Sequence, residues 1–82
     1  MSSMDTAREL ARKKVFRESL KRMQQAAADQ RQALGAIGAD EKTIRRADLR
    51  LMEISNQITR ENDAIHRMEQ ELGIAQGGDP GD

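Results

Sequence analysis

The sequence contains no cysteine, tryptophan or tyrosine, and only one phenylalanine and one proline. Without cysteine, disulfide bonds and thiolate metal sites are excluded, which fits a reducing cytoplasm. With almost no aromatic side chains, the chain lacks the large groups that usually fill a globular core. At 82 residues it has room for one small domain, whose stability must come from many modest contacts.

Long apolar runs and a dominant charge are also missing. No stretch approaches the roughly 20 apolar residues of a membrane-spanning helix, so we expect no membrane contact and a cytoplasmic location. Fourteen Lys and Arg balance fourteen Asp and Glu. Residues 1–34 carry eight basic and four acidic side chains, whereas residues 35–82 carry six and ten. The two halves are electrostatically complementary, which favours packing side by side and also pairing between two copies.

What the sequence does contain is a heptad repeat in its second half. Between Ile44 and Leu72, apolar residues recur at alternating spacings of three and four, which places them on one narrow stripe of a helix. Glu61 is the single charged residue in that stripe. The first half carries a less regular stripe that includes Lys13. The predicted helix–helix seam consists of Phe16, Leu20, Met23, Ala27, Leu34, Ile44, Leu51, Ile54, Ile58, Ile65, Met68 and Leu72.

Glycine and capping residues set the expected boundaries. No Gly or Pro interrupts residues 4–34, and Gly35 is expected to end the first helix in the left-handed conformation. Asp40 offers a side-chain acceptor at the start of the next helix, and Gly73 repeats the stop signal. We expect a lead-in at 1–3, a helical hairpin at 4–74 (helices about 4–34 and 40–73, loop about 35–39) and a flexible Gly/Pro/Asp tail at 75–82.

A loop of about five residues forces two such helices to fold back antiparallel. The expected fold is all-α, an antiparallel two-helix hairpin that resembles a coiled coil. In this register Lys13 faces Glu61, and we expect a partly buried ion pair that disfavours other registers. A lone pair of helices is marginally stable, so we also expect a homodimer in the form of a four-helix bundle.

Residues outside the seam suggest two kinds of partner. Leu49 and Met52 lie on the opposite side of the second helix, and with Phe16 they are the candidate contacts to a protein. The first helix instead offers basic side chains that could contact nucleic-acid phosphates. The candidate phosphate contacts are Arg12, Lys14, Arg17 and Lys21. The same residues also fit an ordinary solvated face, which the zero net charge and the missing aromatic platforms favour.

No residue pattern indicates enzymatic chemistry. His66 is the only histidine and shares a helical face with Asp63, but a structural metal site needs about four ligands. The sequence shows no nucleophile with its base and no phosphate-binding glycine loop. We therefore expect no enzyme activity, no metal and no cofactor.

The expected hairpin is similar in architecture to the plasmid copy-control RNA-binding protein Rop and to the two-helix co-chaperones of type III secretion needle subunits. The chain shares no residue motif with either of these families, so the similarity implies no site residues. The leading hypothesis is a non-enzymatic protein–protein interaction module, such as an adaptor, co-chaperone or inhibitor, of a kind often encoded by phages or mobile elements. The alternatives are a Rop-like nucleic-acid-binding regulator and a structural component that folds within a larger assembly.

Overall fold

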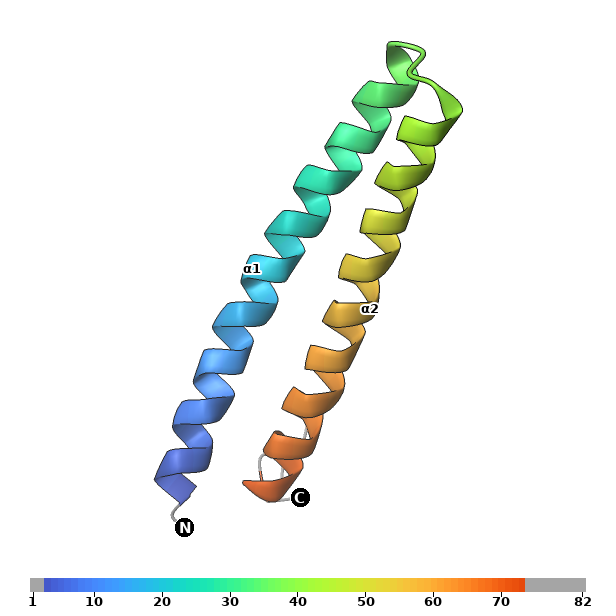
Figure 1. Ribbon diagram of the computed structural model, residues 1–82. Helices are drawn as coiled ribbons and strands as arrows, with labels where there is room; N and C mark the ends of the chain where they lie inside the picture. The colour runs from blue at the N-terminus through green and yellow to red at the C-terminus, as the bar shows by residue number, and fades with distance from the viewer. Residues whose placement is uncertain (1–2, 74–82) are drawn as a thin grey trace, which may run out of the picture.

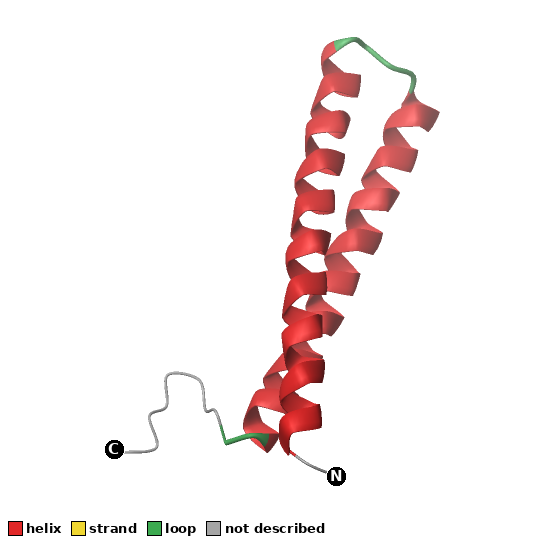
Figure 2. Cartoon of the chain, turned by 90° about the vertical axis from the view of Figure 1, so that its left-hand side faces the viewer, coloured by secondary structure: helices red, strands yellow, loops and turns green. Residues whose placement is uncertain are grey.

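The computed structural model describes residues 3–73, which form two helices (Figure 1). Helix α1 spans Ser3–Ala36 and helix α2 spans Glu41–Glu71. The helices lie antiparallel and side by side, and they cross at a small angle in the view of Figure 2. The predicted helical hairpin is confirmed, with a longest dimension of 55 Å. The predicted tail at 75–82 and the first two residues of the lead-in lie outside the described residues.

Helix α1 runs past the expected stop, because Gly38 rather than Gly35 takes the left-handed conformation. Gly35 is helical, and Gly38 has a φ of 73°. The backbone N–H groups of Gly38 and Ala39 donate to the carbonyls of Gly35 (3.2 Å) and Leu34 (2.9 Å). These are the two bonds of a Schellman motif, which satisfies carbonyls at the end of a helix. Gly38, rather than Gly35, therefore ends the helix and begins the turn toward α2.

Helix α2 is capped at both ends by its own sequence. Asp40 Oδ1 accepts the backbone N–H of Thr43 at 2.9 Å, as an N-cap residue does. Hydrogen bonds from the Thr43 side chain and backbone hold the pKa of Asp40 below its usual value. At the other end, Leu72 closes the helix and Gly73 has a φ of 77°. Each end of α2 thus has a local capping contact.

The two helices meet along a seam that follows a regular heptad on both sides. The seam is defined by the partly or fully buried positions Thr6, Leu10, Lys13, Arg17, Leu20, Gln24, Ala27, Arg31 and Leu34 of α1, and Ile44, Ala47, Leu51, Ile54, Ile58, Glu61, Ile65, Met68 and Leu72 of α2. The fully buried members are Leu10, Leu20, Ala27, Ile54 and Ile65. Most of the apolar surface therefore comes from α2, whereas α1 supplies polar side chains at more than half of its seam positions.

Two residues predicted to lie in the seam, Phe16 and Met23, lie beside it, and each is 43% exposed. The neighbouring positions Arg17 and Gln24 face α2 instead, because their side chains donate hydrogen bonds to it. Their aliphatic stems cover apolar surface while their terminal N–H groups reach acceptors on α2. Arg17 Nε is buried and has no hydrogen-bond partner among the described residues. The apolar side chains displaced from the seam are left on the outside of α1.

Candidate interaction surfaces

One edge of the hairpin is closed by hydrogen bonds between the helices. Arg31 Nε donates to Asp48 Oδ1 at 2.7 Å. Gln24 Nε2 donates to Ser55 Oγ, and Arg17 Nη1 donates to Asn62 Oδ1, both at 2.9 Å. The bonds recur every seven residues on each helix, so they repeat on one side of the pair. We call this side the polar edge; its three bonds fix the register of the two helices.

The predicted Lys13–Glu61 contact lies within the seam. Lys13 Nζ is 3.6 Å from Glu61 Oε1, and the two side chains are 29% and 18% exposed. Glu61 Oε1 is buried and accepts no hydrogen bond from the described residues. The attraction is therefore that of two charges rather than of a short hydrogen bond. Such a pair adds little net stability, but a register that separated the charges would leave one of them buried and unpaired.

The opposite edge of α1 carries a second heptad stripe, which lies outside the seam with α2. We call it the outer stripe; its members are Arg12, Phe16, Ser19, Met23, Ala26, Gln30 and Ala33, together with Ile37, which directly follows the last residue of the helix. Large side chains at Phe16, Met23 and Ile37 alternate with the small side chains of Ser19, Ala26 and Ala33. All except the partly buried Ser19 are exposed. A stripe with this spacing is the pattern by which one helix packs against another.

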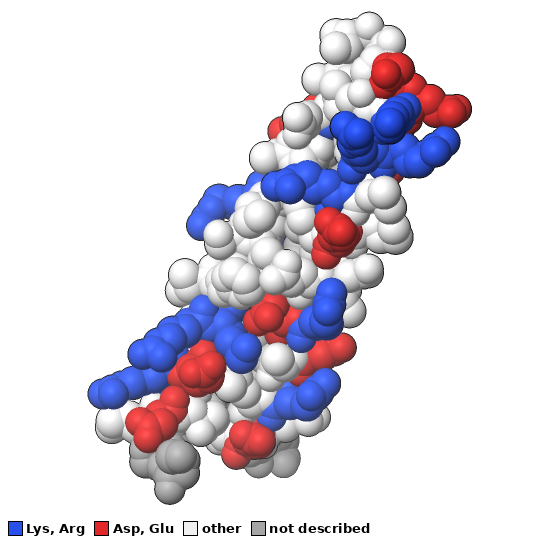
Figure 3. All heavy atoms as spheres, in the orientation of Figure 1, with Lys and Arg blue, Asp and Glu red and all other residues white. Residues whose placement is uncertain are grey.

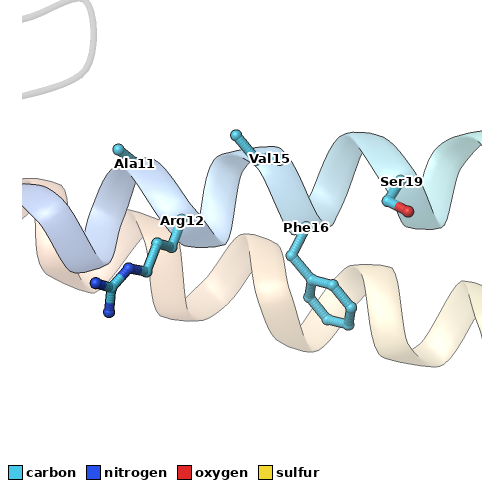
Figure 4. A pocket seen from close by; sticks show the side chains of 5 residues that line it. All are labelled: Ala11, Arg12, Val15, Phe16 and Ser19. Atoms are coloured by element: carbon cyan, nitrogen blue, oxygen red, sulfur yellow. The ribbon is translucent and has the colours of Figure 1, made fainter.

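A shallow depression lies at the start of the outer stripe, lined by Ala11, Arg12, Val15, Phe16 and Ser19. Figure 4 shows that Arg12 and Phe16 leave α1 on one side, whereas Ala11 and Val15 leave it on the other. Val15 is 69% exposed, and with Ala11 and Phe16 it gives the depression a mostly apolar lining. The depression belongs to α1 alone.

Leu49 and Met52 form a separate patch on α2. Both are about half exposed. Met52 follows Asp48 by four residues and precedes Ser55 by three, so it lies on the side of α2 that carries the polar edge. Phe16 belongs to the outer stripe on the other edge. The structure therefore does not bring the three predicted partner contacts together; it places them on two faces.

The basic side chains proposed as phosphate contacts are mostly paired within the hairpin. Lys14 Nζ lies 3.1 Å from Glu69 Oε2, and Lys21 Nζ lies 3.5 Å from Glu18 Oε2. Arg17 belongs to the polar edge, whereas Arg12 lies on the outer stripe and has no ion pair among the described residues. Figure 3 shows acidic and basic side chains interspersed over the visible face. The four residues do not form one continuous basic stripe.

Residues 3–73 contain no group of three or more His, Cys, Asp or Glu side chains arranged to hold a metal ion. His66 instead contacts Gln70, with 3.3 Å between the two Nε2 atoms. Neither α1 nor α2 is apolar enough over its length to cross a membrane.

Comparisons with protein families, with curated proteins and with solved structures found no match. The candidate surfaces thus rest on the geometry of the chain itself.

Several positions of α1 were missing from the predicted seam, among them Leu10, Arg17 and Gln24. A signal for them was present in the spacing of Leu20, Ala27 and Leu34, which lie seven residues apart. A seam needs a second set of positions three residues before these, which falls on Arg17, Gln24 and Arg31, with Leu10 one heptad earlier. The apolar Phe16 and Met23, one residue away, drew the prediction to the wrong side of the helix.

Proposed function

We propose that this chain is a non-enzymatic protein–protein interaction module that acts in the cytoplasm as a small adaptor, co-chaperone or inhibitor. In this proposal the hairpin pairs with a second copy of itself in a four-helix arrangement and presents a remaining face to a different protein. The observation that carries the proposal is the distribution of apolar side chains. The described residues bury five apolar side chains, one of them only an alanine, and expose seven large ones.

The exposed apolar side chains are not scattered singly. Phe16, Met23 and Ile37 follow one heptad stripe, and Leu49 and Met52 lie one helical turn apart. Contiguous exposed apolar surface on a small protein marks interaction sites. A hairpin with so small a buried core also gains stability from association, because a partner that binds only the folded state shifts the equilibrium toward it. Folding and binding therefore favour each other.

A nucleic-acid role is a weaker alternative. It would use Arg12, Lys14, Arg17 and Lys21, yet three of these already contact polar or acidic side chains of the hairpin. Binding to phosphates would have to compete with these contacts, and it would fall steeply with salt because counterions are released. If the protein is not retained on immobilised DNA or RNA at ~50 mM salt, this alternative is excluded.

The Leu49–Met52 patch gives a direct test of partner binding. The variant L49K/M52K places two charges on the patch, whereas the control N56K/T59K places the same charges one heptad later on the same face, where the surface is already polar. All four positions are exposed, so circular dichroism should show unchanged helicity. We expect the wild type and N56K/T59K to retain the same protein in affinity capture from the source cell, and L49K/M52K to lose it.

Two outcomes count against the patch. Equal retention by all three proteins would show that Leu49 and Met52 do not contact the partner. Equal loss in both double variants would show that added charge, rather than removal of the apolar side chains, disturbs binding.

A further inference from the structure

We propose that the outer stripe of α1 is the surface that binds a second copy of this chain, with the two α1 helices antiparallel. This inference rests on the proposed function, because it assigns one of the two exposed faces to self-association and leaves the other for a different protein. Three features of α1 support it: the sizes of its side chains, the shape of the depression and the position of two opposite charges.

The sizes of the side chains fit an antiparallel pair. In such a pair each position of one heptad set faces a position of the other set. With Met23 opposite Ala26 of the second copy, Phe16 faces Ala33 and Gln30 faces Ser19. These three layers each join a large side chain to a small one, and the polar Gln30 meets another polar residue. The fourth layer, at the end of the contact, places Ile37 against Arg12. A parallel pair would place Phe16 against Phe16 and Ala26 against Ala26, which overfills one layer and leaves a gap in another.

The depression on α1 has the shape that this contact requires. Arg12, Val15, Phe16 and Ser19 line it, and their spacing of three, one and three residues is that of the four-residue hole that receives one side chain from a facing helix. In the register above, the side chain that enters the hole is Ala33 of the second copy. Because alanine is small, it leaves room in this layer for Phe16, which lines the depression.

Charge fixes the same register independently of size. Arg22 and Asp29 lie on the exposed flank of the outer stripe, seven residues apart and too far along the helix to contact each other. In the antiparallel register, Arg22 of each copy faces Asp29 of the other, so the two-fold axis creates two ion pairs. Within the described residues Arg22 has no partner, and Asp29 accepts only the side chain of Gln25, at 3.0 Å. Both charges are therefore open to a second copy.

Helix α2 does not supply a second apolar seam on this side. Its residues there include Arg46, Arg50 and Arg60, with Glu53 between them. The two α2 helices therefore flank the contact between the α1 helices rather than closing a common apolar core. The Leu49–Met52 patch, on the other edge, stays exposed in the dimer.

Light scattering of the purified chain over a range of concentrations tests this surface. We expect the mass of a dimer for the wild type and of a monomer for M23K, since the substitution puts a charge at the centre of the contact. Q32K is the matched control, because it adds the same charge to an exposed position of α1 outside the outer stripe. L49K/M52K should also remain a dimer. Circular dichroism should show the same helicity for all four proteins.

A charge exchange tests the antiparallel register without touching any apolar residue. R22D alone and D29R alone each turn two attractive pairs into two repulsive ones, and we expect dimerisation roughly tenfold weaker in each. The double variant R22D/D29R restores both pairs and should recover the affinity of the wild type. Recovery is specific to an arrangement in which residue 22 of one copy faces residue 29 of the other.

The opposite results would overturn the inference. A wild type that is monomeric at every concentration would exclude the second copy, and the capture experiment with L49K/M52K would then decide whether the interaction function stands without it. A dimeric M23K would show that another face pairs the two copies. A double charge variant no tighter than the single ones would exclude the antiparallel register.

Discussion

Exchanging glycine for alanine at two positions of the turn should change stability in opposite directions. Gly35 is helical, and alanine is favoured over glycine within a helix by roughly 0.5–1 kcal/mol. A Cβ at Gly35 would lie 3.2 Å from Arg31 Nη1, the far end of a flexible side chain, so a small shift of that end accommodates it. Gly38 has a φ of 73°, and alanine in the left-handed region costs roughly 1–2 kcal/mol. G35A should therefore stabilise the hairpin and G38A should destabilise it.

The cost at Gly38 comes from the backbone alone, since no heavy atom lies within 4 Å of an added Cβ. For a domain of this size, 1 kcal/mol shifts the melting temperature by about 4–8 °C, so the two variants should melt roughly 10 °C apart. Thermal unfolding followed by circular dichroism measures the difference, with both variants at one protein concentration because association affects stability. A destabilised G35A beside an unaffected G38A would refute the assignment of Gly38 as the left-handed residue.

Two further predictions concern the cap and the ion pair. The pKa of Asp40 is lower in the folded state than its unfolded-state value of about 3.8. The Asp40 carboxylate therefore stabilises the fold at pH values above about 3.8, and this contribution is lost as the pH falls through the lower pKa of the folded state. D40N keeps a capping oxygen but should lack this loss in an acid titration of the melting temperature, and an unchanged titration would contradict the assignment. Replacing the ion pair by apolar residues in K13M/E61L should raise the free energy of unfolding by about 1–2 kcal/mol, whereas E61Q alone should lower it by up to ~1 kcal/mol. Urea denaturation measures both, and a double variant less stable than the wild type would show that the pair itself stabilises the hairpin.

The arrangement of α2 followed from the sequence because one physical signal dominated it. Its apolar residues recur at heptad spacing with one charged exception, and the residues at its two ends, Asp40 and Gly73, act where a cap and a stop are needed. The short connection then left only an antiparallel arrangement of the two helices. The hairpin, the face of α2 that meets α1 and the approach of Lys13 to Glu61 could therefore be predicted from the sequence.

Helix α1 could not be placed as well, because its apolar residues belong to two stripes. Phe16 and Met23 are more apolar than Arg17 and Gln24, and apolar character alone assigns them to the seam. The structure reverses the choice because α2 offers Ser55 and Asn62 as acceptors at that edge. Polar complementarity between two helices depends on their register and rotation, which hydrophobic periodicity in one helix does not determine. The end of α1 could not be predicted either, because the local sequence allows Gly35 or Gly38 to be the left-handed residue that ends the helix.

The seven-residue interval of the polar edge also bears on how long the hairpin can be. Because Arg31–Asp48, Gln24–Ser55 and Arg17–Asn62 are related by one heptad on each helix, inserting or deleting seven residues in both arms preserves the face of every remaining side chain. Each such step changes the length by about 10 Å, at 1.5 Å per residue. An insertion of one or two residues in one arm turns the part beyond it away from the other arm. The hairpin is in effect a spacer whose length is adjustable only in whole heptads, with the turn and its glycine unchanged.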